Sequence, residues 1–353
     1  MQAGVAKREV DLLAGGPPCQ PFSKSRYWVN GDAPRFHDPR AKMLHHYVDV
    51  VEELLPRTLL LENVRGLSYF GKDEGLVFLR AALTKVNARC GTAYAPIVMH
   101  LNAADYGVPQ LRERVFVIAS RDGVAFEPPE PSHHEYLTTT NVQRYCTAWD
   151  AIGDIENSPT EDTRLTGKWA ELLPAIPEGG NYLFHTPRGG GKPLFGWRTR
   201  YWSFLLKLAK NRPSWTIQAT PGPATGPFHW QNRRLTTREL ARLQTFPDSY
   251  TFTGDNRSAQ RQIGNAVPPA LAEILGIAIQ HQFLNGRKGR HRKPSLAISR
   301  RTDCPTPTPP LSVPRKYMVL CGEHGDHPGT ARGPGALTRN ATTSSEQSTR
   351  AMD

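Results

Sequence analysis

The sequence predicts an α/β fold built on a mostly parallel sheet. Short apolar runs that end in glycine or polar residues alternate with longer segments whose apolar residues recur at helical spacing. The 353 residues, of which 38% are hydrophobic and 22% charged, can bury one large core and a smaller one. Strands and helices that alternate at this spacing favour a sheet with helices on its faces.

The predicted elements follow one another along the first part of the chain. A helix over 42–55 is expected because Leu44, Val48, Val51 and Leu55 recur on one face. The other elements expected in this part are strands over 10–16, 58–62, 95–101 and 115–120, and a helix from 76 to 86.

Two further helices are predicted later in the chain. Thr236 or Thr237 can cap a helix that places Leu240 and Leu243 on one face. A last helix begins with two prolines at 268–269, because proline is tolerated in the first turn of a helix.

The regular pattern stops at about residue 128, which predicts a division into domains. Residues 1–127 and 233–286 are expected to form the large catalytic α/β domain. Clusters of proline and glycine with isolated tryptophans occupy 128–232, where we expect a smaller, loop-rich domain. Residues 287–353 are rich in Pro, Ser, Thr and Gly without periodicity, and we expect a disordered basic tail there.

Charge and cysteine content limit the classes of partner and compartment. The net charge of +12 favours a polyanionic partner, although residues 287–353 hold more than half of the excess, with 12 Lys and Arg against 5 Asp and Glu. The five cysteines are widely spaced without a CxxC pair, which argues against a disulfide framework and a metal site. The longest apolar run, "ILGIAI", is far shorter than the roughly 20 residues of a membrane span. These features predict a soluble cytoplasmic protein with no membrane partner.

A cysteine follows two consecutive prolines in "GGPPCQPFS", at the expected carboxyl end of a strand. Proline restricts φ and glycine permits close backbone approach, so we expect a rigid attachment for Cys19 followed by a mobile loop. Open α/β sheets bind their ligands at this edge. Taken alone, the cysteine could equally be a small buried hydrophobic residue.

Other polar residues lie at the expected strand ends. "TLLLE" ends in Glu62, and "QLRER" places Gln110, Arg112 and Arg114 just before the strand over 115–120. Singly, the glutamate could cap a helix and the arginines could be solvated charges at the rim. A thiol, a carboxylate and two guanidiniums at one edge together predict a catalytic site.

Five segments occur in one order along the chain and together resemble the DNA cytosine-5 methyltransferase family. They are "GGPPCQPFS", "LLLENVRGL", "QLRERVFVIAS", "RRLTTRELARLQTFPDSY" and "QIGNAVPPALAE". The resemblance covers residues 10–283, and an ordered set of motifs is far more specific than one short pattern. It implies a Rossmann-like methyltransferase sheet, with a target-recognition region at 128–232. The implied reaction transfers a methyl group from S-adenosylmethionine to carbon 5 of cytosine in double-stranded DNA.

The resemblance also implies the roles of the catalytic residues. Cys19 matches the nucleophile that adds to carbon 6 of the base, because carbon 5 alone is a poor nucleophile. Glu62 matches the group that protonates N3 and needs a raised pKa to hold that proton. Arg114 and Arg112 match the guanidinium that binds O2 of the base and stabilises the developing charge.

Contacts with DNA are implied in two segments. The face of the cytosine ring must meet both the thiol and the methyl donor, so the base has to leave the duplex stack. The loop over 20–40 is expected to close behind it, with Gln20 and Ser23 near the DNA. Arg233 and Arg234, at the end of the recognition region, are expected to contact phosphates.

The resemblance is incomplete where the family binds S-adenosylmethionine. Pro18, Met43, Asn265, Ala266 and Val267 match the family's cofactor contacts. The glycine-rich FxGxGG turn does not precede the cysteine, so two βαβ units, roughly 60 residues at about 30 per unit, are expected to be missing. A preceding segment or a second chain would then complete the site, and we expect this chain alone to bind the cofactor weakly.

Two alternative functions stay open. One is an inactive or partner-dependent DNA-binding fragment of such an enzyme. The observation that discriminates is whether the upstream DNA encodes an in-frame or neighbouring FxGxGG segment. The other is the tRNA-methylating branch of the same family. The long variable region argues against that branch, because it is larger than a tRNA-specific enzyme would need.

Overall fold

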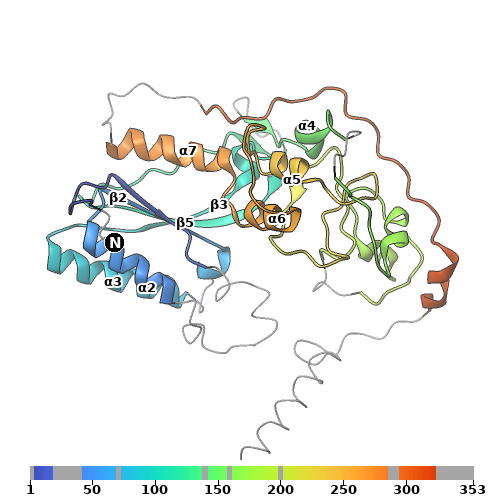
Figure 1. Ribbon diagram of the computed structural model, residues 1–353, viewed down its shortest axis with the longest axis horizontal. Coiled ribbons are helices and arrows are strands. Elements are labelled where there is room, and N and C mark those ends of the chain that lie inside the picture. The colour runs from blue at the N-terminus through green and yellow to red at the C-terminus, as the bar shows by residue number, and fades with distance from the viewer. Residues whose placement is uncertain are drawn as a thin grey trace, which may run out of the picture.

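A four-stranded sheet with helices on both faces forms one half of the molecule (Figure 1). The computed structural model describes residues 4–18, 42–68, 73–136, 142–156, 161–197, 202–284 and 294–322. The strand order is β1-β2-β5-β3. The strands are β1 Leu12–Gly15, β2 Thr58–Asn63, β3 Ile97–Asn102 and β5 Glu113–Ser120.

The sheet is mixed: β1, β2 and β3 run in one direction, as expected for a mostly parallel sheet, and β5 runs in the opposite direction. β1 and β2 pair in parallel, but β5 is antiparallel to both β2 and β3. A parallel connection needs a crossover of about a dozen residues or more. Residues 103–112 form a 3₁₀ turn at Ala103–Tyr106 and the short β4 (Gln110–Leu111) with no crossover helix, so β5 returns alongside β3 in the opposite direction.

Alternate residues of β5 face two different helical layers. Val115 and Val117 lie in a buried cluster with α2 (Lys42–Leu54) and α3 (Glu74–Cys90). Phe116 and Ile118 lie in a second cluster with α7 (Pro269–Ile279). This alternation follows from the two-residue period of a strand, and Figure 1 shows α7 on one face of the sheet with α2 and α3 on the other.

The stretch Asn256–Leu284 is the described segment whose length and composition would suit a membrane span. It contains α6 (Asn256–Asn265), α7 and a π-helical turn at Gln280–Leu284. Leu271, Leu275 and Ile279 pack within the buried cluster against the sheet, which is the packing of a core helix.

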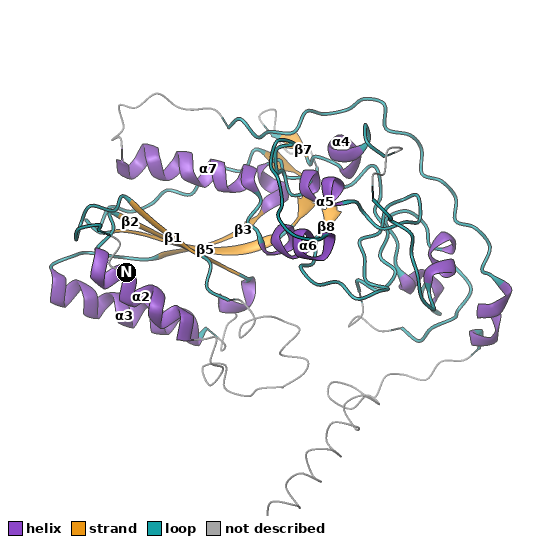
Figure 2. Ribbon diagram, in the orientation of Figure 1, coloured by secondary structure: helices purple, strands orange, loops and turns teal. Residues whose placement is uncertain are grey.

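Loops predominate in the other half of the molecule (Figure 2). A buried cluster joins α4 (Ala148–Ile152) to α5 (Thr237–Leu243) and α6, so one core spans the predicted domain boundary at 232. Another cluster is built around a 3₁₀ turn at Ala170–Ala175. The remaining elements are β6 His133–His134, β7 Gln143–Arg144, β8 Ser214–Trp215 and 3₁₀ turns at Arg65–Ser68, Tyr182–His185 and Arg315–Leu320.

The expectation of a disordered tail is wrong for residues 294–322. This segment crosses the surface in a largely extended course, and Tyr317 near its end is only 3% exposed. Composition did not reveal this packing, because a few apolar and charged anchors among many prolines leave no periodic pattern.

Candidate active site

The antiparallel pairing of β2 and β5 brings two predicted residues together. Glu62 of β2 is paired with Phe116 of β5, and Arg114 lies two residues before Phe116 on the same face. Glu62 Oε1 is 2.9 Å from Arg114 Nε, and the side chains are 19% and 13% exposed. The predicted carboxylate and one predicted guanidinium therefore form a partly buried ion pair. The pair lies where β2 ends and β5 begins, which is the carboxyl end of the parallel strands.

The backbone that leads to the predicted nucleophile runs against this ion pair. Asn63, which is 1% exposed, donates from Nδ2 to the Pro17 carbonyl at 3.1 Å. A Cβ atom added to Gly16 would lie 3.5 Å from Glu62 Oε2. At Gly15, a Cβ atom would lie 2.6 Å from the Tyr47 ring, so a side chain there would displace the strand or the ring. Gly15 thus allows β1 to approach α2 closely, whereas a Cβ atom at Gly16 would make only an ordinary van der Waals contact with Glu62.

Three predicted residues lie outside the described part of the chain. They are Cys19, Gln20 and Ser23. Pro18, which precedes Cys19, is described and exposed. Asn63, which orients this segment, was not singled out from the sequence, although it directly follows Glu62 in the "ENV" motif.

Opposing influences act on the protonation of Glu62. Burial raises the pKa of its carboxyl above the ordinary value of 4.5, and the positive charges of Arg114 and Arg112 offset part of the rise. The net direction favours the protonated acid relative to an exposed glutamate. A carboxyl in this environment can donate a hydrogen bond at a pH where an ordinary glutamate cannot.

Arg112 has a different environment from Arg114. Its side chain is fully buried and donates hydrogen bonds to the carbonyls of Ile217 at 3.3 Å, Gly264 at 2.7 Å and Ala266 at 2.9 Å. These bonds connect the start of β5 to the turn after α6. The contacts are those of a residue that holds a loop, whereas the sequence led us to expect a solvent-facing or base-binding guanidinium.

Gln110 belongs to the same buried network. It donates from Nε2 to Gln244 Oε1 at 2.9 Å and accepts from the Ile217 amide at 3.1 Å. Gln244 in turn donates to the Ile263 carbonyl at 2.6 Å. Three motifs distant in the sequence, "QLRER", "ARLQ" and "QIGNAV", are therefore joined by buried hydrogen bonds.

The predicted cofactor residues come from separate elements. Asn265 is exposed at the end of α6, Ala266 and Val267 are partly exposed in the turn that follows, and Met43 is 46% exposed near the start of α2. Their apolar side chains suit the faces of a planar heterocycle such as adenine, and the amide and the backbone suit its polar edge. None of the predicted contacts is acidic, so these residues alone offer no carboxylate to ribose hydroxyls.

Arg233 and Arg234, the two arginines expected to contact DNA, differ in how their guanidinium groups are held. Arg233 is 11% exposed and forms two hydrogen bonds to the buried Glu239 carboxylate, at 2.8 and 2.7 Å. It also donates to the carbonyls of Glu156 and Arg234. The Arg233 guanidinium is therefore held inside the protein, an arrangement that does not favour phosphate contact.

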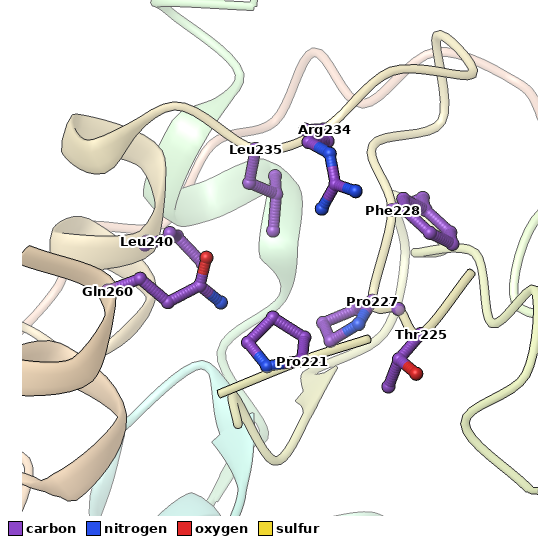
Figure 3. Close-up of a pocket in the computed structure, with 9 residues that line it drawn as sticks. Pro221, Thr225, Pro227, Phe228, Arg234, Leu235, Leu240 and Gln260 are labelled. Carbon is purple, nitrogen blue, oxygen red and sulfur yellow. The ribbon is translucent and has the colours of Figure 1, made fainter. Parts of the chain in front are cut away.

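Arg234 lines an open pocket between residues 221–228 and the helices α5 and α6. Figure 3 shows its guanidinium and the amide of Gln260 pointing toward the space between them. Arg234 donates to the Pro223 carbonyl at 3.2 Å. The other lining residues are Pro221, Thr225, Gly226, Pro227, Phe228, Leu235 and Leu240. An accessible guanidinium in this position suits an anionic ligand better than that of Arg233 does.

Comparison with known proteins decides the family. Residues 2–281 match the family described as C-5 cytosine-specific DNA methylase. The chain belongs to this family. A similar relative is the Type II methyltransferase M.SacI of Streptomyces achromogenes, 41% identical over 301 residues, with 79% of this chain and 74% of that protein covered. The Type II methyltransferase M1.HphI of Haemophilus parahaemolyticus is 36% identical over 284 residues, covering 77% and 68%.

Solved structures show a looser overlap with this methylase. A similar one is the methyltransferase EhMeth of Entamoeba histolytica, with a TM-score of 0.47 and 18% sequence identity. The match covers 78% of this chain and 76% of that chain. The family assignment therefore depends on the sequence match. The mixed sheet and the Glu62–Arg114 pair are compatible with that assignment.

Proposed function

We propose that this cytosine-5 methyltransferase acts on duplex DNA through a covalent adduct on Cys19, with S-adenosylmethionine as the methyl donor. The observation that carries the proposal is the Glu62–Arg114 ion pair, which lies against the backbone entering Pro17 and Pro18. A thiol two residues after Pro17 would start beside an acid and a guanidinium. That combination is what nucleophilic addition to a pyrimidine ring requires.

The proposed reaction begins with attack on carbon 6 of the cytosine. The Cys19 thiolate forms a carbon–sulfur bond there, and the electrons of the 5,6 double bond move toward carbon 5 and N3. Glu62 donates a proton to N3, and Arg114 donates hydrogen bonds to O2 of the base. Both contacts strengthen as negative charge develops on the ring, so they favour the transition state over the bound substrate.

The second half of the reaction restores the thiolate. S-adenosylmethionine, when bound, supplies the methyl group that carbon 5 takes up. A base then removes the proton from carbon 5, the carbon–sulfur bond breaks with Cys19 leaving as a thiolate, and the 5,6 double bond reforms. The proton on N3 returns to Glu62, which restores both the neutral base and the acid. Because Arg112 is fully buried and bonded to the turn after α6, we assign it a positioning role and leave the contact with the base to Arg114.

The proposed cofactor contacts are Pro18, Met43, Asn265, Ala266 and Val267. Arg112 holds the Ala266 carbonyl at 2.9 Å, so the turn that presents the last three is tied to the same strand that carries Arg114. Through this connection, a shift of the cofactor turn would also move the edge of the active site.

The proposed DNA contacts include Gln20 and Ser23 near the extruded base and Arg234 at a phosphate. Residues 128–232 are proposed to choose the target sequence, because base edges are read by side chains presented in a groove. The chain's relatives are named Type II methyltransferases. We therefore propose a cytoplasmic enzyme of a restriction–modification system.

Trapping on 5-fluorocytosine tests the mechanism. Fluorine at carbon 5 cannot leave as a proton. Duplex DNA with this base and S-adenosylmethionine should therefore yield a covalent complex that survives denaturing electrophoresis, once the chain is completed by co-expression with a family segment that carries the FxGxGG turn. Cys19→Ser should abolish the complex, and Cys304→Ser, at an exposed cysteine, should leave it unchanged. A complex that persists in Cys19→Ser would overturn the assignment. Trapping on tRNA in place of DNA would identify the RNA-methylating branch.

A further inference from the structure

Residues 294–322 form a surface segment, here called the strap, that connects the two halves of the molecule. Figure 1 shows it running from near α7, past α4, to the far side of the loop-rich half. Three anchors fix it along this course, and the amides of Thr308 and Leu311 add hydrogen bonds to Glu178 and to the Pro174 carbonyl. The function of the family accounts for none of them.

The first anchor joins the strap to the sheet-bearing half. The Glu273 carboxylate on α7 accepts hydrogen bonds from the Ser295 amide at 2.9 Å, the Ser295 hydroxyl at 2.6 Å and the Leu296 amide at 2.9 Å. Leu296 also packs against the cluster that contains α7 and β5. This end of the strap is therefore attached to the layer that covers the catalytic sheet.

The middle anchor is an ion-pair network on α4 and α5. The Arg301 amide donates to Asp150 Oδ1 at 2.8 Å, and the Arg301 guanidinium lies 2.9 Å from Asp154 Oδ1. Asp154 is also paired with Arg242 of α5 at 2.8 Å. Trp149 donates from its indole to Asp303 at 3.1 Å. The strap thus adds a cation to the contact between α4 and α5.

The last anchor is an aromatic side chain inserted into the loop-rich half. Tyr317 is 3% exposed and stacks on Trp169, with ring centroids 5.8 Å apart and planes inclined by 17°. Its hydroxyl donates to the Lys168 carbonyl at 2.7 Å. Val313 and Leu320 pack against the same cluster. The core of this half is therefore completed by residues that lie about 90 positions later in the sequence than its last other member, Phe228.

We propose that the strap holds the target-recognition region at a set distance from the catalytic sheet, with Arg301 and Tyr317 as positioning residues for methyl transfer to DNA. This inference rests on the proposed function. DNA must contact the recognition region and the Glu62–Arg114 edge at the same time. A fixed separation between them lowers the entropy lost when the duplex binds, and it keeps the extruded base aligned.

A loosened strap should affect binding more than chemistry. Once DNA is saturating, the bound duplex itself can hold the two halves in place, so the maximal rate should change little. At low DNA concentration, the enzyme must first adopt the competent arrangement, so the KM for DNA should rise. Discrimination between the target site and single-base variants should fall as well, because the recognition contacts are less rigidly placed.

The test uses point variants of the full chain with plasmid DNA. Wild-type methylation mapped by bisulfite sequencing defines the target, and duplexes with the target or one altered base pair are then assayed. Tyr317→Ala and Arg301→Ala should each raise the KM for DNA about 10-fold, with kcat within about twofold of wild type. Tyr317→Phe keeps the stacking on Trp169 and should restore most of the affinity. Leu311→Ala, at a strap side chain that is 67% exposed, is the control.

A readout independent of activity separates this inference from the proposed function. Hydrogen exchange should accelerate in residues 165–197 and 202–230 of both alanine variants, while β2 and β5 stay unchanged. Unchanged exchange there, or a lower melting temperature with the wild-type KM, would overturn the strap proposal. Absence of fluorocytosine trapping by the completed wild-type enzyme would instead overturn the proposed function.

Discussion

Burial and neighbouring positive charge have opposite effects on the pKa of Glu62. This residue lies at the end of an apolar strand, where desolvation favours the neutral acid, and beside Arg114, which favours the anion. A group balanced in this way can exchange a proton with N3 of a bound cytosine while its position is held by the ion pair. The roles of these two side chains are therefore coupled.

Replacement of Glu62 by glutamine should slow methyl transfer about 100-fold or more, because the amide cannot deliver a proton to N3. Single-turnover assays with excess enzyme would measure the chemical step directly. Glu113→Gln is the matched control, since Glu113 is 57% exposed at the start of β5, next to Arg114, and pairs with Arg65. Equal rates for the wild type and the Glu62 variant would exclude an acid role.

The raised pKa of Glu62 also predicts how stability changes with pH. The folded state retains the proton at pH values where the unfolded chain has lost it, so the contribution of Glu62 is complete below its ordinary pKa of 4.5 and declines as pH rises through the folded value. The melting temperature of Glu62→Gln relative to wild type should therefore increase from pH 4.5 toward neutrality. A constant difference across this range would contradict the raised pKa.

Arg233 and Arg234 provide a matched comparison of adjacent residues. Arg234→Ala should weaken binding to all duplexes similarly and reduce the slope of log affinity against log salt by about 1, because one phosphate contact is lost. Arg233→Ala should instead lower the free energy of unfolding by about 3–5 kcal/mol, because Glu239 would be left buried without its cation. Salt titrations and urea denaturation distinguish the two. A reduced salt slope in Arg233→Ala alone would reverse the assignments.

At the scale of elements, the edge of the sheet is organised by β1, β2 and β5. The parallel pairing of β1 with β2 places the exit of β1 next to Glu62, and the antiparallel return of β5 adds Arg114 from the other side. Asn63 connects the two parallel strands at this edge through the Pro17 carbonyl. The active site therefore depends on strand directions as much as on residue types.

Asn63→Asp should loosen this connection without changing the size of the side chain. The carboxylate can still accept from the Val64 amide but cannot donate to Pro17, so the segment entering Cys19 loses its hydrogen bond. We expect slower fluorocytosine trapping with unchanged affinity for DNA. Asn87→Asp removes a comparable bond to the Tyr94 carbonyl far from this edge and should leave trapping intact. Equal trapping in the two variants would show that the bond has no positioning role.

At the scale of the molecule, the two halves share a buried core and are joined by the strap. The cluster that contains α4, α5 and α6 crosses the predicted boundary at 232, so the recognition region is not separable at that residue. Tyr317 supplies an aromatic ring to the other cluster from the end of the strap. Exchange of recognition regions between relatives must respect both contacts.

A graft that respects them should transfer specificity. We expect replacement of residues 155–232 by the corresponding segment of M.SacI to move the methylated site to that of the donor. The graft leaves α4 in place and retains a tryptophan at the position of Trp169, so that both packing partners are present. Bisulfite sequencing of a plasmid would show the new site. A graft that methylates the original site would place the specificity determinants outside this segment, and a graft without Trp169 should show weaker DNA binding.

The apolar periodicity of the sequence predicted some secondary-structure elements and missed others. The helices at α2, α3, α5 and α7 and the strands of the sheet were predicted because their apolar residues recur with clear periods. α6 was missed because its composition, "NRSAQRQIGN", is almost wholly polar, and only Ala259, Ile263 and Gly264 are buried. Its start is signalled by Asp255, whose side chain accepts from the Ser258 amide, but this is a weak signal without an apolar face.

The family was determined by the sequence alone, because five ordered motifs carry it. The same motifs predict the nucleophile, the acid and the guanidinium by residue type. Tertiary structure decided which of them meet. A strand's reversal depends on the length and course of its connection, and this brought Arg114 to Glu62. Arg112, two positions earlier in the sequence and just before β5 begins, donates hydrogen bonds to three backbone carbonyls instead. Side chains with the same chemistry at one spacing acquire different roles because burial and hydrogen-bond partners come from segments distant in sequence.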